Sequence, residues 1–157
     1  MTKRTQDGEA FSDLVLEVFR LNGLLLAAGD QLAEPAALTA ARWQVLGVAD
    51  HGPAPVANVA RIMGLTRQAV QSTSDALERD GFVEYSNNPH HRRAKLIVLT
   101  DKGRAALRQV EARQVEWADR LGAVIGLQTL KAAAEGLKRA RQSLEADATP
   151  DTRKTRK

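Results

Sequence analysis

Apolar residues near the start of the chain recur at steps of three and four positions, which is the spacing of an amphipathic helix. The residues that set this spacing are Phe11, Leu14, Val15, Val18, Phe19, Leu21, Leu25 and Leu32. We expect this helix to end near Glu34-Pro35, because the residue before a proline avoids helical backbone angles. Residues 1–10 precede the pattern and are predicted to be a flexible N-terminus.

Three shorter helical patterns follow. The first begins after Thr39, whose hydroxyl suits an N-cap, and it ends at the segment 51–55, which contains glycine and proline. The second and third patterns cover residues 56–63 and 66–79. Only Gly64-Leu65 separates them, and Thr66 is again a suitable N-cap. Asp80-Gly81 ends the third pattern.

The period of the pattern then changes to two residues. Residues 83–86 alternate between apolar and polar side chains, and residues 94–100 form a second apolar run after the polar turn 87–93. We therefore expect an antiparallel hairpin with a polar tip. Helical spacing returns after Thr100 and continues to residue 147, with a break around Gly122 and Gly126. These patterns predict a mainly α-helical fold with one small antiparallel β-hairpin.

The last helical pattern carries a separate signal. Leu130, Leu137 and Leu144 stand seven residues apart, and Leu127 belongs to the same seam. This spacing is typical of a helix that packs against another helix. The partner helix belongs either to the same chain, as for most apolar helix stripes, or to a second copy. Residues 148–157 are polar and basic and are predicted to be a disordered tail.

The composition narrows the classes of function. The chain has no cysteine, which excludes disulfides, thiolate metal ligands and thiol-based redox sensing. No apolar run approaches the roughly 20 residues that span a bilayer, and the polar N-terminus is unlike a signal peptide. We therefore expect a soluble, cytoplasmic protein without membrane contact. The net charge is +4, but basic side chains gather at Arg92, Arg93 and Lys95 and in the tail, which suits phosphate contact.

His90 and His91 beside this basic cluster raise the alternatives of a metal site or a catalytic pair. Adjacent side chains of an extended strand point to opposite faces, which is a poor arrangement for binding one ion. His51 is the only other histidine, and no His-x3-His spacing occurs. No catalytic arrangement and no glycine-rich phosphate loop is evident. The sequence predicts no enzyme, no metal site and no cofactor, and it favours turn residues that donate hydrogen bonds to phosphates.

A short helix, a tight turn, a second helix and a basic hairpin together describe a winged helix-turn-helix. In such a unit the second helix lies in the major groove of DNA and presents side chains to base edges. The residues of this helix predicted to contact DNA are Thr66, Arg67, Gln68, Gln71, Ser72, Asp75 and Arg79. Arginine pairs with guanine and glutamine with adenine, so this set suits the reading of a duplex. The alternative is a polar helix face that is only solvated.

At this point the chain resembles the MarR family of multiple-antibiotic-resistance-type transcriptional regulators, from residue 11 to residue 146. The resemblance rests on the segments LTAARWQVL, VANVARIMGLTRQAVQSTSDALERDGFVEY and NPHHRRAKLIVLTDKG. The family's wing typically reads Asp-x-Arg, a short strand, Leu-Thr and a glycine. In this chain that pattern places the wing arginine at Arg93, the closing pair at Leu99-Thr100 and the glycine at Gly103.

The resemblance implies that residues 66–79 form the recognition helix and that Arg93 enters the minor groove. His91, Arg92 and Lys95 flank this arginine and are predicted to contact DNA with it. Two positions depart from the family pattern. His91 stands where the family has aspartate, so it gives Arg93 no permanent anionic partner. Ser72 stands where many members have an arginine, which would remove one phosphate or base contact.

The resemblance also implies a homodimer built from the first, fifth and sixth helices. Two recognition helices about one DNA turn apart, ~34 Å, would then read a pseudo-palindromic operator in double-stranded DNA. The residues predicted at the dimer interface are Leu14, Val18, Leu127, Leu130, Leu137 and Leu144.

Family members often sense small aromatic or anionic molecules in a cleft between the dimer helices and the DNA-binding lobe. Arg42 and Trp43 lie on the helix expected beside this cleft, and Trp117 lies on another helix. These residues are the predicted effector pocket. Ordinary packing of both tryptophans is the alternative, because buried tryptophan usually belongs to a core.

Together these patterns predict a winged helix-turn-helix domain at residues 39–100 and a helical dimerisation region at residues 11–38 and 101–147. The expected function is a sequence-specific, DNA-binding transcriptional regulator, namely a repressor that a small effector releases. Two alternatives stay open: an architectural protein that binds DNA without sequence preference, and a winged-helix module that binds other proteins.

Overall fold

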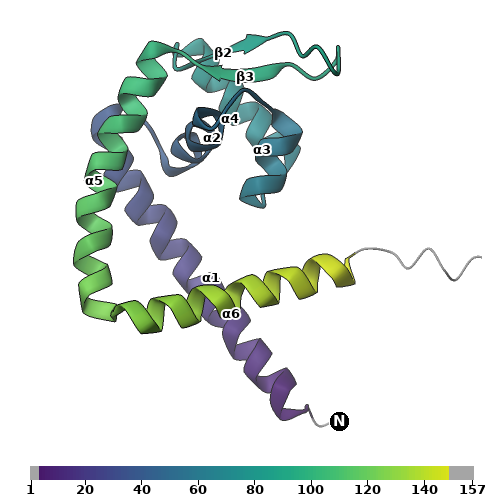
Figure 1. Cartoon of the computed structure of the whole chain (residues 1–157), viewed down its shortest axis with the longest axis vertical. Coiled ribbons are helices and arrows are strands. Elements are labelled where there is room, and N and C mark those ends of the chain that lie inside the picture. Colours follow the sequence, from purple (N-terminus) through teal and green to yellow (C-terminus); the bar gives the residue numbers. More distant parts are fainter. Residues whose placement is uncertain (1–3, 149–157) are drawn as a thin grey trace, which may run out of the picture. The chain divides into compact units, whose positions relative to one another are not determined.

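The computed structural model describes residues 4–148 as a mainly helical chain with one small β-sheet (Figure 1), and it divides into two compact units after Gln114. The first unit contains α1 (Gln6–Ala33), the 3-10 turn η1 (Glu34–Ala36), α2 (Ala40–Asp50), β1 (Ala54–Pro55), α3 (Val56–Met63), α4 (Arg67–Arg79), β2 (Val83–Ser86), β3 (Leu96–Leu99) and the first part of α5 (Asp101–Ile125). The second unit contains the rest of α5 and α6 (Leu127–Asp147). The fold class predicted from the sequence is confirmed.

Threonine hydroxyls cap the starts of three helices. The hydroxyls and the amides that donate to them are Thr5 and Gly8 (3.1 Å), Thr39 and Arg42 (3.2 Å), and Thr66 and Ala69 (3.1 Å). The caps at Thr39 and Thr66 confirm the predicted helix starts. The cap at Thr5 was not predicted, and it begins α1 at Gln6. The expected flexible segment through residue 10 is therefore wrong for residues 6–10, and residues 149–157 of the predicted tail lie outside the described residues.

A close contact joins the end of α1 to the start of α2. Asp30 Oδ1 accepts a hydrogen bond from the backbone N–H of Ala40 at 2.7 Å, so a side chain of α1 satisfies a free amide at the start of α2. Gly29 permits this approach, because a Cβ there would lie only 2.9 Å from the Cβ of Ala40. The last turns of α1 are thereby fixed to the body formed by α2, α3 and α4.

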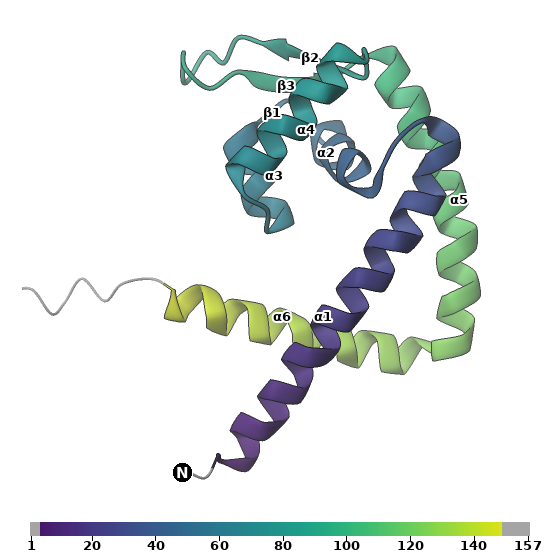
Figure 2. The ribbon, with the colours of Figure 1, turned by 180° about the vertical axis from the view of Figure 1, so that it is seen from behind.

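The sheet has three antiparallel strands in the order β1-β3-β2 (Figure 2). β2 and β3 form the predicted hairpin, in a register that pairs Tyr85 with Ile97. β1 was not predicted, because a strand of two residues is too short to show alternation. Its Ala54 also pairs with Ile97. Pro55 suits this place because an edge strand does not need every backbone N–H.

The core of the first unit is mainly aliphatic. Its fully buried apolar side chains are Val45, Leu46, Val59, Val70, Leu77, Val83, Ile97, Leu107 and Val110. Burial of each stabilises the fold by about 1.5–3 kcal/mol relative to exposure, so this cluster holds α3 and α4 firmly against the sheet.

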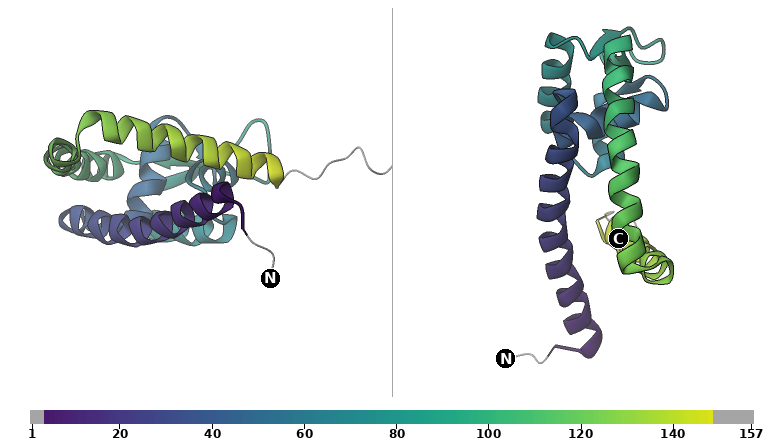
Figure 3. Two further views of the ribbon diagram at one scale, coloured as in Figure 1. Left: turned by 90° about the horizontal axis from the view of Figure 1, so that it is seen from below. Right: turned by 90° about the vertical axis from the view of Figure 1, so that its left-hand side faces the viewer.

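The long helices are much less buried within the chain. In α1 only Gly29 and Ala33 are buried, and in α6 no described residue is. Figure 3 shows α1 as one continuous helix, and its Phe19 and Leu24 are 71% and 70% exposed. None of the helices within residues 4–148 is long and apolar enough to cross a membrane.

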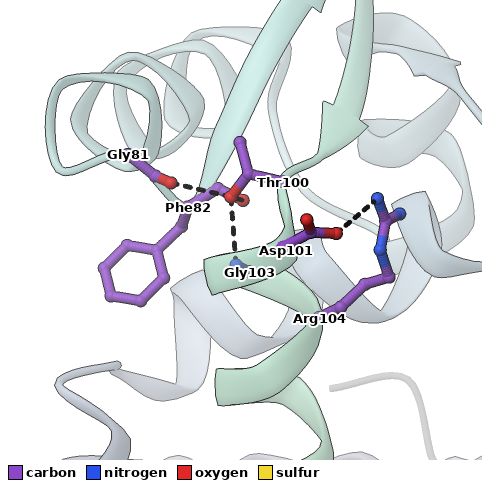
Figure 4. A network of polar contacts seen from close by, with 6 residues as sticks. All are labelled: Gly81, Phe82, Thr100, Asp101, Gly103 and Arg104. Atoms are coloured by element: carbon purple, nitrogen blue, oxygen red, sulfur yellow. Dashed lines mark hydrogen bonds and ion pairs between the residues drawn. The ribbon is translucent and has the colours of Figure 1, made fainter.

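A polar junction forms where α5 begins (Figure 4). The hydroxyl of Thr100 accepts from the N–H of Gly103 at 3.1 Å and lies 2.7 Å and 3.0 Å from the carbonyl oxygens of Gly81 and Phe82. Its single proton is therefore directed at the turn between α4 and β2. The backbone N–H of Thr100 donates to the Phe82 carbonyl at 3.1 Å. A Cβ on Gly103 would lie 2.0 Å from this same carbonyl oxygen, so only glycine fits.

We expect Gly103→Ala to lower the free energy of unfolding by about 3 kcal/mol, because the new methyl group must displace backbone rather than a flexible side chain. Gly47→Ala is the matched control. At Gly47, in the middle of α2, an added Cβ would meet no atom of the described chain within 4 Å beyond its own stretch of helix. The control should gain about 0.5–1 kcal/mol. Urea unfolding of both variants measures the difference, and equal effects would contradict the proposed clash.

Candidate nucleic-acid interface

The turn between α3 and α4 sets the direction of α4. Gly64 ends α3 with a left-handed backbone (φ 65°), and the N–H of Leu65 returns to the carbonyl of Ala60 at 2.9 Å. Thr66 then caps α4 at once. A change of direction in so few residues requires a positive φ, which glycine adopts without strain.

α4 has one buried side and one exposed side. Val70, Ser74 and Leu77 are buried, and Thr73 is half-buried. The residues predicted to contact DNA are all exposed: Thr66, Arg67, Gln68, Gln71, Ser72, Asp75 and Arg79. The structure thus brings the whole predicted set to one surface of the recognition helix.

Three side chains of this surface and the sheet form a network. Gln71 Nε2 donates to Asp75 Oδ1 at 2.7 Å and to the Tyr85 hydroxyl at 3.0 Å. The Tyr85 hydroxyl donates to the same Asp75 oxygen at 2.7 Å. Burial of Tyr85 and its hydrogen bond to Asp75 raise the pKa of the tyrosine well above its ordinary value, so the hydroxyl keeps its proton. The sequence did not predict Tyr85 as a site residue.

The loop between β2 and β3 is a tight polar turn, as predicted. Asn88 holds it: its side-chain Oδ1 accepts from the N–H of His90 at 3.0 Å, and its carbonyl accepts from the N–H of His91 at 3.3 Å. The N–H of Ala94 donates to the His91 carbonyl at 3.0 Å. His90 and His91 lie in turns rather than in a strand. Across residues 4–148, no three His, Asp or Glu side chains gather in a way that could hold a metal ion.

The wing carries exposed positive charge. Its exposed residues include His91, Arg92, Arg93 and Lys95. In the described part of the chain, no carboxylate lies within ion-pair distance of the three cations. Their charge is therefore available to a polyanion.

A cleft of about 730 Å³, lined mostly by polar and charged residues, lies between α4 and the wing. Arg67, Gln68 and Gln71 line it from α4, and Arg93 and Lys95 line it from the wing. Residues that are more than twenty positions apart in sequence thus share one surface. Amides and guanidinium groups that face the same cleft can contact base edges and phosphates together.

Two of the three residues predicted for the effector pocket, Arg42 and Trp43, do not line one cavity. Arg42 is only 20% exposed, and its guanidinium pairs with Asp80 at 2.7 Å. Trp43 lines a different, apolar cavity of about 750 Å³. Neighbouring residues of a helix point about 100° apart, which explains why Arg42 and Trp43 do not share a cavity. Trp117 belongs to the second unit, and its place in an effector pocket stays a prediction.

The predicted dimer residues are poorly covered within the chain. Leu14 is half-buried. The other five are 37–62% exposed: Val18, Leu127, Leu130, Leu137 and Leu144. The heptad seam of α6 is thus an apolar stripe that is largely exposed. Large exposed apolar areas usually mark interaction sites.

A helix-turn-helix with an exposed polar recognition face and a cationic wing defines the class of winged helix-turn-helix DNA-binding proteins. The MarR family model matches residues 38–94, which span α2 to the wing. The uncharacterized protein Rv2011c of Mycobacterium tuberculosis is 37% identical over 134 residues, which cover 85% of this chain and 94% of that protein. The transcriptional activatory protein BadR of Rhodopseudomonas palustris is 27% identical over 100 residues, 61% of this chain and 57% of that protein.

Solved structures agree with this assignment. The transcriptional repressor CouR, bound to a 23-mer DNA duplex, is 26% identical, covers 88% of this chain and 99% of its own, and superposes with a TM-score of 0.73. CouR from Rhodococcus jostii RHA1 bound to p-coumaroyl-CoA is 26% identical, covers 88% of this chain and 93% of its own, and has a TM-score of 0.66.

The chain belongs to the MarR family of winged helix-turn-helix transcriptional regulators. It is a DNA-binding transcriptional regulator and not an enzyme, as the sequence predicted.

Proposed function

We propose that the protein is a cytoplasmic, homodimeric repressor that binds a pseudo-palindromic operator and is released from it by a small molecule. The observation that carries this proposal is the shared cleft of α4 and the wing, where Gln68, Gln71 and Arg67 face Arg93 and Lys95. CouR, which is similar over most of both chains, is a repressor and is bound to DNA in one structure.

Each half of the interface has a distinct task. α4 enters the major groove, and the side chains near its start reach base edges. Arg93 enters the adjacent minor groove, while Arg92 and Lys95 contact phosphates. Arg93 lacks the anionic neighbour that the family's aspartate would provide. The turn held by Asn88 and by the bond between Ala94 and His91 fixes the backbone on either side of it instead.

The homodimer accounts for the uncovered apolar helices. Isolated apolar residues on a surface are ordinary, but α1 and α6 both carry rows of them. Packing α1, α5 and α6 against a second copy would bury these rows. A twofold axis would then place two recognition helices about one DNA turn apart and impose the same symmetry on the operator.

The apolar cavity beside Trp43 is the proposed effector site. α1 contributes Leu25 and Leu26 to its wall, α2 contributes Trp43 and Val48, and the end of α3 contributes Met63. Polar groups from Asn22, Gln44 and His51 complete the lining and can orient a ligand with an aromatic body. The cavity thus lies between α1, which belongs to the proposed dimer interface, and α2 and α3, which pack against α4. A ligand that prefers one arrangement of these helices would shift the equilibrium between DNA-binding and released dimers.

Two substitutions test the division between affinity and specificity. We expect Arg93→Ala to weaken binding to nearly all DNA sequences. The slope of log K against log salt concentration should also become shallower by about one. Gln68→Ala should cost about 1–3 kcal/mol mainly on the preferred operator. Fluorescence titration on operator and random duplexes over a salt series measures both. Equal losses on all sequences for both variants would support an architectural DNA-binding protein instead.

The dimer interface has its own test. Leu137→Glu places a charge in the middle of the α6 seam and should yield monomers, because the seam would have to bury an unpaired carboxylate. Gln142→Glu adds the same charge on the opposite side of α6 and should leave the dimer intact. Sedimentation gives the mass of each species, and circular dichroism shows that the variant remains folded. A folded Leu137→Glu dimer would refute the proposed interface.

A further inference from the structure

The amide of Gln71 is held in one orientation on the recognition helix. Its Nε2 lies 2.7 Å from Asp75 Oδ1 and 3.0 Å from the Tyr85 hydroxyl oxygen. Asp75 follows one helical turn later on α4, and Tyr85 lies on β2, so the amide is braced from its own helix and from the sheet. Gln71 is exposed and lines the cleft, and its remaining amide atom, Oε1, has no hydrogen bond to the described part of the chain.

The chemistry of the partners determines which amide atom of Gln71 lies beside Asp75. A carboxylate only accepts hydrogen bonds, so the Gln71 atom beside Asp75 must be the NH₂ group and not the carbonyl oxygen. The Tyr85 hydroxyl has a single proton, and Asp75 receives it at 2.7 Å. The tyrosine oxygen can then only accept from Gln71. The Asp75 and Tyr85 oxygens lie on the same side of Nε2, and we assign one hydrogen of the Gln71 amide to each of them.

We propose that Gln71 reads DNA only as a hydrogen-bond acceptor and selects a base that presents an amino group in the major groove, namely adenine through N6 or cytosine through N4. This inference rests on the proposed role of α4 as the recognition helix. A free glutamine recognises adenine with two hydrogen bonds, one of them donated to N7. Gln71 has no hydrogen left for N7. Guanine O6 and thymine O4 are themselves acceptors and would face the Oε1 lone pairs, which excludes them.

Asp75 and Tyr85 are positioning residues in this scheme. They set the polarity of the Gln71 amide without touching the base that it reads. Gln68 offers an internal comparison, because it lies on the same exposed face one turn earlier. Within residues 4–148 its side chain forms no hydrogen bond to the protein, so its amide can rotate and both donate and accept.

The experiment begins with the operator selected from random DNA by the full-length protein. Failure to select any operator would contradict the proposed function itself, before Gln71 is tested. In a second selection, Gln71→Ala should lose preference at one base of each half-site, and that base should be adenine or cytosine. A guanine or thymine there, or no altered position, overturns the inference and leaves the proposed function standing.

Base analogues then test single atoms at that position. If the base is adenine, purine removes the N6 amino group and should weaken binding of the wild-type protein about five- to tenfold. In contrast, 7-deazaadenine removes N7 and should change binding less than twofold. If the base is cytosine, pyrimidin-2-one removes the N4 amino group and should have the effect of purine. An equal loss of affinity with 7-deazaadenine, or no loss of affinity on removing the amino group, contradicts the proposal that Gln71 acts only as an acceptor.

Tyr85→Phe keeps the ring but removes the hydroxyl, which releases one hydrogen of the Gln71 amide. The variant should accept guanine or thymine at the Gln71 position several-fold better relative to the preferred base, and its preference at the Gln68 position should be unchanged. A purely structural role of Tyr85 would instead weaken binding to all bases by one common factor, and that result would overturn the positioning role.

Discussion

The position of the wing relative to α4 depends on the junction where α5 begins. Thr100 and Gly103 bring the end of the wing strand and the first turn of α5 against the carbonyl of Phe82, just after α4 ends. The ion pair between Arg42 and Asp80 connects α2 to the same junction. Since β3, α4 and α5 all meet there, the distance between the recognition helix and the wing is fixed by backbone contacts. Such contacts tolerate little adjustment, because interiors are close-packed.

A fixed distance matters because the proposed interface gives α4 and the wing different tasks. The wing presents cations, which attract any DNA backbone and carry no sequence information. α4 presents neutral amides with Arg67, and their value depends on orientation. The hydrogen bonds of Gln71 to Asp75 and Tyr85 order this side chain before DNA arrives. Preordering of this kind lowers the entropy lost on binding and restricts the bases that fit.

The sequence was informative where a structure follows from local spacing. Period and capping residues located every α-helix of the first unit, apart from the start of α1, because a helix is built from contacts between near neighbours. The residues that the sequence missed act over distance. Tyr85 lies 14 positions from Gln71, and no spacing rule links a strand tyrosine to a helix amide. The sequence placed Gly103 only within the wing motif. The physical reason for a glycine there is the Phe82 carbonyl, which lies too close to admit a Cβ. The pairing of Arg42 with Asp80 likewise required the packing of α2 against the end of α4.

In the proposed complex, two copies of α4 and two wings read one duplex as a symmetric pair. Selection of bound sequences from a random DNA pool is the most direct test. A symmetric pair should enrich an inverted repeat whose half-sites are centred about 10 base pairs apart, or one turn of the duplex. Enrichment of a single unrepeated site, or recovery of unselected DNA at every round, would contradict it.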